Sequence, residues 1–125
     1  MSAGRWTLRL EVDEPESRVA VALDESATIV GLASAGIARD QDEPTSWELY
    51  LINVAADRLG SGLADDLMLA AAGDMDMTVW VLSRNARAQA FYVRHGFTVE
   101  GATKLHDGTG ASEIRMVRRS GASDR

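Results

Sequence analysis

Three small residues, Gly60, Gly62 and Ala64, lie in the run LGSGLA between a strongly apolar segment and an amphipathic one. Small side chains let the main chain turn sharply and let a ligand approach the backbone, while the first N–H groups of a following helix point outward. Such a loop favours binding of a phosphate or pyrophosphate. A tight turn without a ligand explains the two glycines equally well. The GxxxxGK[ST] and Rossmann GxGxxG patterns are both absent.

Three polar side chains offer proton or hydrogen-bond chemistry. The phenol of Tyr92 is protonated at neutral pH and is a competent donor, although a tyrosine packed on a sheet with its hydroxyl in solvent is the alternative. Asn85 precedes a helical pattern, where Asn is a favoured N-cap. Glu48 lies in the apolar run WELYLINV, and burial there favours proton uptake by a carboxyl group. A solvent-facing strand glutamate is the alternative for Glu48.

The composition narrows the class of protein. The 125 residues suffice for one domain, residues 1–125, without disulfides or metals. The chain contains no cysteine, which excludes thiol nucleophiles and cysteine–zinc sites and fits a cytoplasmic protein. Its net charge of −6 disfavours nucleic-acid binding. No apolar run approaches the roughly 20 residues that span a bilayer, and His95 and His106 are too isolated to define a metal site.

Hydrophobic periodicity predicts the elements that must position these residues. The predicted strands are residues 18–23, 27–38, 47–54, 77–82, 97–100 and 113–118, and the predicted helices are residues 63–72 and 85–95. Residues 5–10 alternate in polarity and form either a short strand or the last turn of a helix. Residues 120–125 are expected to be a disordered tail.

The connection through residues 63–72 predicts a right-handed crossover between two parallel strands. The short connections elsewhere predict antiparallel neighbours. The sequence therefore predicts an α+β domain with a mixed, mostly antiparallel sheet and one central parallel pair.

Two segments resemble the GNAT family of N-acetyltransferases. WELYLINVAADRLGSGLADDLM is similar to the family's cofactor strand and pyrophosphate loop, with Gly62 and Ala64 in register and Leu59 where the family prefers Arg or Gln. VWVLSRNARAQAFYVRHGFTVEG is similar to the segment in which a strand ends at Asn and leads into a helix with Phe-Tyr, closed by Gly-Phe. The residues in register there are Asn85, Ala86, Ala88, Phe91, Tyr92, Gly96 and Phe97. The resemblance extends over residues 18–119.

This resemblance implies a V-shaped cofactor cleft between strands 47–54 and 77–82. It implies transfer of an acetyl group from acetyl-CoA to a primary amine by direct attack, without an acyl-enzyme and without a metal. Tyr92 would be the general acid that protonates the leaving thiolate, and Glu48 is the candidate base. A backbone N–H near Ile52 would meet the thioester oxygen. The implied cofactor-binding residues are Ile52, Asn53, Val54, Leu59, Gly60, Ser61, Gly62, Leu63, Ala64, Asn85 and Phe91.

The N-terminus departs from the family, whose members usually begin with a further strand and two helices that help to build the acceptor site. Here residues 1–17 are expected to be a reduced form of that region. The leading hypothesis is an active N-acetyltransferase whose acceptor, a small-molecule or protein amine, the sequence does not identify. Two alternatives are an inactive CoA-binding module with a sensory or assembly role and a structural domain that binds no cofactor.

A shortened sheet would expose the edge of the strand at residues 18–23. Because exposed edges tend to pair or to be covered, we expect a homodimer through that edge or through the C-terminal strand. No membrane or nucleic-acid partner is expected.

Overall fold

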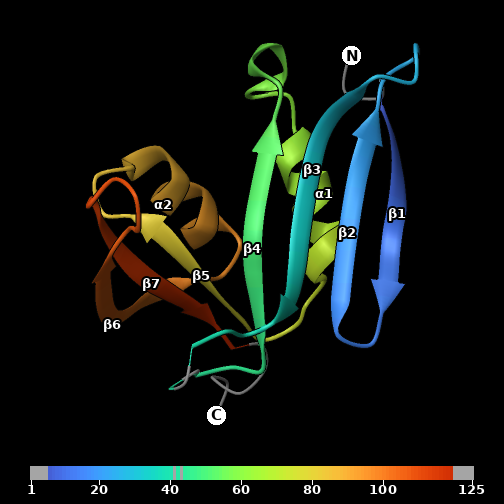
Figure 1. The fold of residues 1–125 in the computed structure, drawn as a ribbon. Coiled ribbons are helices and arrows are strands. Elements are labelled where there is room, and N and C mark those ends of the chain that lie inside the picture. Colours follow the sequence, from blue (N-terminus) through green and yellow to red (C-terminus); the bar gives the residue numbers. More distant parts are fainter. Residues whose placement is uncertain (1–5, 41, 43, 120–125) are drawn as a thin grey trace. The chain divides into compact units, whose positions relative to one another are not determined.

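The computed structural model describes residues 6–40, 42 and 44–119 (Figure 1). The strands are β1 (Thr7–Glu14), β2 (Ser17–Leu23), β3 (Ile29–Ile37), β4 (Trp47–Val54), β5 (Met77–Leu82), β6 (Thr98–Leu105) and β7 (Ser112–Arg118). The α-helices are α1 (Leu63–Ala72) and α2 (Ala86–Arg94), and the short 3-10 turn η2 (Ala56–Arg58) precedes α1.

The strand order is β1-β2-β3-β4-β5-β7-β6, in which β4 and β5 are the parallel pair that α1 connects. The fold is therefore α+β with a mixed, mostly antiparallel sheet, as the sequence predicts. The chain divides into two compact units. The first unit contains residues 1–37 and 49–74, and the second contains residues 38–48 and 75–125.

The first unit packs α1 on the antiparallel strands β1, β2 and β3. Its core cluster consists of Ala20, Ala22, Val30, Ala33, Leu63, Leu67 and Ala71. A side chain at Gly31 would place its Cβ 2.7 Å from the Cδ1 of Leu67, so the absence of a side chain there lets the helix approach the sheet closely. Gly73 ends α1, where its N–H bonds to the carbonyl of Leu69.

The second unit contains the antiparallel strands β5, β7 and β6 together with α2. Asn85 caps α2, because its Oδ1 accepts a hydrogen bond from the N–H of Ala88 at 3.0 Å. Gly96, with φ +92°, terminates the helical run. Phe97 is 1% exposed and makes an edge-on contact with the ring of Tyr92, which anchors α2 to this unit.

Three predicted elements have the boundaries that the sequence indicates: residues 47–54, 63–72 and 77–82. The ambiguous N-terminal segment is a strand, because β1 pairs along its length with β2, so the helical alternative is wrong. β6 extends to Leu105, beyond the predicted end at residue 100. A register shift between Val99 and Thr103, around Gly101, lets the strand continue. The predicted tail, residues 120–125, lies outside the described residues.

The strand predicted to be an exposed edge, residues 18–23, does not lie at an edge, because β2 is paired with β1 on one side and with β3 on the other. The edge argument for residues 18–23 is therefore wrong. The C-terminal strand β7 lies between β5 and β6. A homodimer stays a prediction without that support.

Over the ranges that the structure describes, we find no helix with both the length and the apolar character required to cross a membrane.

Candidate functional site

The glycine loop of residues 59–64 has the backbone conformation that its sequence favours. Gly60 and Gly62 adopt φ values of +77° and +94°, in the left-handed region that favours glycine. A Cβ at either position would meet no atom within 4 Å. The two glycines therefore serve the turn itself, and they leave open space over the backbone at the start of α1.

Several backbone donors at this loop lack a partner within the described part of the chain. The N–H of Asp66 makes the first helical bond, to the carbonyl of Gly62 at 3.2 Å. The N–H of Leu63 donates to the Oγ of Ser61 at 3.2 Å, and that hydroxyl donates to the carbonyl of Arg58. Gly60, Gly62 and Ala64 have no hydrogen-bond acceptor for their N–H groups among the described residues. Donors of this kind, together with the helix dipole, attract an anion.

The end of β4 presents its backbone beside this loop within the first unit. Ile52 and Val54 are half-buried and pack against the core cluster, whereas Asn53 is exposed. The N–H of Ala55 donates to the carbonyl of Val30 at 2.9 Å, which ties the end of β4 to β3. The packed side chains fix the strand, so its main chain has a defined position.

Tyr92 is a buried phenol in the second unit. Its residue is 7% exposed, and its ring makes edge-on contacts with Phe91 and Phe97 at centroid distances of 5.4 and 5.6 Å. Burial raises the pKa of Tyr92 to about 12, so the hydroxyl keeps its proton at neutral pH. Among the described residues the hydroxyl has no hydrogen-bond partner, and it is not sealed from solvent. It is thus available to a ligand.

Asn85 and Phe91 lie at opposite ends of α2. The Asn85 side chain is committed through Oδ1 to the helix cap, which leaves its amide NH₂ group as the donor for any ligand. The ring centroids of Phe91 and His95 lie 4.7 Å apart, and the guanidinium of Arg94 lies 5.3 Å from the centroid of Phe91. The predicted helix cap at Asn85 is confirmed, and the ligand roles of both residues stay predictions.

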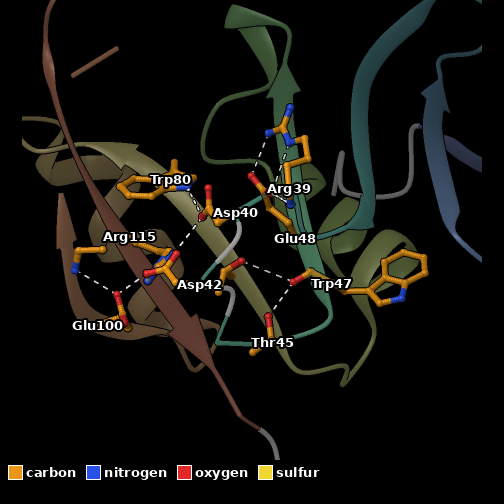
Figure 2. Close-up of polar contacts among 11 residues, drawn as sticks. Arg39, Asp40, Asp42, Thr45, Trp47, Glu48, Trp80, Glu100 and Arg115 are labelled. Carbon is orange, nitrogen blue, oxygen red and sulfur yellow. Dashed lines mark hydrogen bonds and ion pairs between the residues drawn. The ribbon is translucent and has the colours of Figure 1, made fainter. Parts of the chain in front are cut away.

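Glu48 is buried and paired with Arg39 (Figure 2). Its side chain is 2% exposed, so the solvent-facing alternative is wrong. Oε1 accepts hydrogen bonds from the backbone N–H and the Nε of Arg39 at 3.0 and 3.3 Å, and Oε2 accepts one from Nη2 at 2.8 Å. Oε1 therefore accepts two hydrogen bonds and Oε2 only one, which leaves a lone pair on Oε2 for a proton.

The sequence prediction missed a second charged cluster in the same unit, centred on Arg115 (Figure 2). Nε of Arg115 donates to Glu100 at 3.0 Å, and its terminal nitrogens donate to Asp40 and Asp42 at 3.0 to 3.1 Å. The same Oδ2 of Asp40 that binds Arg115 also accepts from the indole N–H of Trp80 at 2.9 Å. These contacts fasten the segment 38–48, which carries Arg39 and Glu48, to β5, β6 and β7.

The electrostatics of this cluster follow from its geometry. Arg115 is 2% exposed, and its hydrogen bonds to Asp42 and Glu100 raise the pKa of the guanidinium despite burial. The same bonds lower the pKa of the Asp42 and Glu100 carboxyls. The ε-ammonium of Lys104 lies 4.3 Å from the centroid of Trp80, which adds a cation–π contact. The one sequence signal for this cluster is Arg115 itself, which stands between apolar residues in the run EIRMVR.

The structure assigns the predicted site residues to both units. The glycine loop and Ile52, Asn53 and Val54 belong to the first unit, while Glu48, Asn85, Phe91 and Tyr92 belong to the second. No group of three or more His, Cys, Asp or Glu side chains that could hold a metal ion occurs within residues 6–40, 42 and 44–119.

A mixed α+β sheet with backbone donors at a glycine loop ahead of a crossover helix is suited to binding an anionic ligand. The model of the acetyltransferase (GNAT) domain matches residues 15–99. The chain therefore belongs to the GNAT acetyltransferase family, which confirms the resemblance seen in the sequence. No protein of curated function matches the chain.

Solved structures agree with this assignment. The histone acetyltransferase HPA2 and related acetyltransferase from Corynebacterium glutamicum is 26% identical with a TM-score of 0.64, and the match covers 83% of this chain and 65% of that one. Nourseothricin acetyltransferase is 24% identical with a TM-score of 0.66, and the match covers 91% of this chain and 84% of that one. The spermidine/spermine N-acetyltransferase SpeG from Vibrio cholerae is 17% identical with a TM-score of 0.66, over 94% of each chain. The last two likenesses establish the fold alone.

Proposed function

We propose that this chain is an acetyl-CoA-dependent N-acetyltransferase that transfers an acetyl group to a primary amine, and that it acts in the cytoplasm. The observation that carries the proposal is the glycine loop, in which the N–H groups of Gly60, Gly62 and Ala64 have no acceptor among the described residues. In a GNAT domain such donors are suited to the pyrophosphate of the coenzyme. The backbone at Ile52–Val54 would then align the pantetheine arm.

The proposed reaction is a direct displacement at the thioester. The amine nitrogen forms a bond to the acetyl carbon, the carbon–sulfur bond breaks, and the nitrogen gives up one proton while the thiolate gains one. Tyr92 supports the second proton transfer, because its hydroxyl is protonated at neutral pH and free of protein partners in the described chain. A backbone N–H near Ile52 would donate to the carbonyl oxygen as charge develops on it.

Glu48 is proposed as the group that takes the proton from the amine. Its burial and its place on β4 favour this role, whereas the three hydrogen bonds from Arg39 oppose it in the present arrangement. Because Oε2 accepts only one of these bonds, it keeps a lone pair that can take the proton.

The first test is acetyl-CoA binding measured by calorimetry on the wild type and on Gly62→Glu. The new carboxylate stands where the pyrophosphate is expected, so binding should fall by at least about a hundredfold. Gly108→Glu is the matched control, because Gly108 has a similar φ of +91° and also faces open space. Equal loss in both variants, or no binding by the wild type, would remove the proposal.

An inactive CoA-binding module is the second candidate. One observation favours it: Leu59, 50% exposed, stands where the family prefers Arg or Gln. Acetyl transfer to a panel of primary amines separates the two functions. Transfer that is lost in Tyr92→Phe while acetyl-CoA binding persists indicates the enzyme, and tight binding without transfer to any amine indicates the module.

A further inference from the structure

β1 forms one edge of the sheet, and its outer side has no strand partner among the described residues (Figure 1). Its inner side pairs with β2 from Thr7 to Glu14, with a register shift between Leu10 and Val12. The outward N–H and C=O groups of an edge strand can pair with a strand of another chain, and proteins usually cover or charge such an edge. The side chains on and beside β1 therefore decide whether this edge repels or accepts a second strand.

Helix α1 runs along β1 on one face of the first unit. Near the beginning of the helix, the carboxylate of Asp66 accepts a hydrogen bond from the indole N–H of Trp6 at 2.9 Å. Near its end, the carbonyl of Ala71 accepts one from Nη1 of Arg18 at 3.2 Å, and Arg18 is the strand partner of Asp13. The part of the helix between these two contacts therefore lies at the level of the middle of β1.

Two exposed leucines lie at this level. Leu10 pairs with Ala20, which belongs to the core cluster under α1, so Leu10 points to the same face of the sheet as the helix. Leu69 follows Asp66 by three residues and so lies on the side of α1 that is turned towards β1. Leu10 is 42% exposed and Leu69 is 61% exposed. The two side chains therefore form an apolar patch at the edge of the first unit.

Opposite charges flank Leu10 along the strand. Arg9 pairs with Val21, so its side chain leaves the sheet on the face away from α1. Its Nε bonds to the carboxylate of Glu11, and the two side chains are 59% and 41% exposed. Both charged groups therefore remain accessible to a second partner. The order along the strand is cation, leucine, anion, and an antiparallel copy of this order is complementary to it.

We propose that β1 pairs in the antiparallel sense with β1 of a second copy of this chain, about a two-fold axis at Leu10. This register sets Arg9 of each copy opposite Glu11 of the other, which gives two ion pairs across the axis. The axis stands perpendicular to the sheet, so both α1 helices lie on one face and the leucines of the two copies meet there. The contact has an apolar centre and a charged rim, as stable interfaces do.

The order of charges favours this register over its neighbours. An axis at Arg9 sets the two Arg9 side chains opposite each other, and an axis at Glu11 does the same for the two carboxylates. Parallel pairing in register also sets like charges side by side. Like charges directly opposite each other across a strand pair are destabilising, so the axis at Leu10 is the favoured one.

The first experiment is disulfide cross-linking of the full chain, because the sequence contains no cysteine. An axis at Leu10 brings the Cα atoms of the two Leu10 residues to about 5 Å, a distance that a disulfide spans. The same register holds the two Thr7 residues about 20 Å apart. Leu10→Cys and its matched control Thr7→Cys are equilibrated with oxidised glutathione, and the covalent dimer is measured on a non-reducing gel. We expect at least about tenfold more dimer from Leu10→Cys, and equal yields would overturn the inference.

Charge reversal tests the ion pairs. One strand pair buries less area than a standard interface, so the dimer should dissociate on dilution, and analytical ultracentrifugation measures its dissociation constant. Arg9→Glu and Glu11→Arg each set like charges opposite each other at two places, and each should raise that constant at least about tenfold. The double variant Arg9→Glu/Glu11→Arg restores opposite charges and should return it to within about threefold of the wild type. Arg87→Glu, at an exposed arginine of α2, is the control. A double variant no tighter than the single ones contradicts the inference.

Leu69→Asp tests the apolar centre. The new charge is desolvated in the contact, so the dissociation constant should rise at least about tenfold. Leu105→Asp is the matched control, because Leu105 is 68% exposed and lies on β6 at the other end of the strand order, and it should leave the constant unchanged. Circular dichroism checks that both variants are folded. A wild type that stays monomeric at every concentration, or a loss of the dimer in Leu105→Asp but not in Leu69→Asp, would overturn the inference.

Discussion

The two units use different parts of the chain to make ligand-binding groups. In the first unit the free donors are backbone N–H groups, held open by glycine conformations above a core of small apolar residues. In the second unit the groups that could transfer a proton are side chains. Even the large charged side chain of Arg115 is buried there, and its ion pairs hold the segment that carries Glu48. A backbone site depends on local conformation, whereas a side-chain site depends on partners that lie far apart in the sequence. Substitutions should therefore act differently in the two units.

The largest expected effect is in the second unit, where Arg115→Met removes the cation shared by three carboxylates. The free energy of unfolding should fall by about 3 kcal/mol, because the partly exposed Asp40 and Glu100 lose the buried cation that balances them. Urea denaturation measures this change. Arg119→Met removes an exposed charge from the same stretch and should change stability by less than about 0.5 kcal/mol. Similar midpoints for both variants would show that the ion cluster does not stabilise this unit.

The next effect is the pH dependence that Tyr92 confers. Burial raises its pKa from 10.0 to about 12, so above pH 10 the unfolded chain loses a proton that the folded chain keeps. Folding stability is therefore fully present below pH 10 and declines as the pH rises to about 12. The decline amounts to about 2–3 kcal/mol. Tyr92→Phe should lack this contribution, as measured by urea unfolding at pH 9 and pH 11.5, and an unchanged pH profile would contradict it.

Substitutions at two glycines of the first unit distinguish the cost of a steric clash in the core from the cost of a strained backbone conformation. Gly31→Val places atoms against Leu67 and should lower stability by about 1–3 kcal/mol. Gly62→Ala meets no neighbour but holds an alanine at φ +94°, which costs about 1 kcal/mol. Thermal unfolding of the two variants measures the difference. A larger loss in Gly62→Ala would mean that loop conformation matters more than the approach of the helix to the sheet.

The smallest expected effect compares how the two helices begin. α2 has a side-chain cap from Asn85, and α1 begins at Gly62 without one. Asn85→Ala should lower stability by about 1 kcal/mol, while Asn85→Ser should retain most of it. If Asn85 also binds the coenzyme, both variants should weaken acetyl-CoA binding. Calorimetry beside thermal unfolding thus distinguishes a cap from a cap that also binds ligand.

The sequence predicts the apolar framework well, because that information is local. The periodicity of LADDLMLAAA and the following glycine determine α1, and the continuous apolar runs determine β4 and β5. β1 was ambiguous, because alternation over a few residues fits a strand or a helix end. β6 was predicted too short, because its residues after Gly101 are mostly exposed and carry no hydrophobic pattern.

The sequence predicts the charged part of the second unit poorly, because its partners are distant in the chain. Arg115 lies more than seventy residues from Asp40 and Asp42, so no local pattern marks their pairing. Likewise, the pairing of Glu48 with Arg39 depends on a turn that no motif marks. The glycine loop, in contrast, has the tight turn that its sequence predicts, since that conformation is encoded by the same few residues.

Residues 38–48 belong to the second unit although the chain on either side of them belongs to the first. The polypeptide therefore crosses between the units at three places, and no single cut yields both of them intact. A protease that cleaves after Asp74 would release two products, of which the N-terminal one still carries Asp40 and Asp42, the ligands of Arg115 on the other product. Such a nicked protein should stay associated as a non-covalent pair and should resist added salt, because ion pairs to the buried Arg115 are screened little.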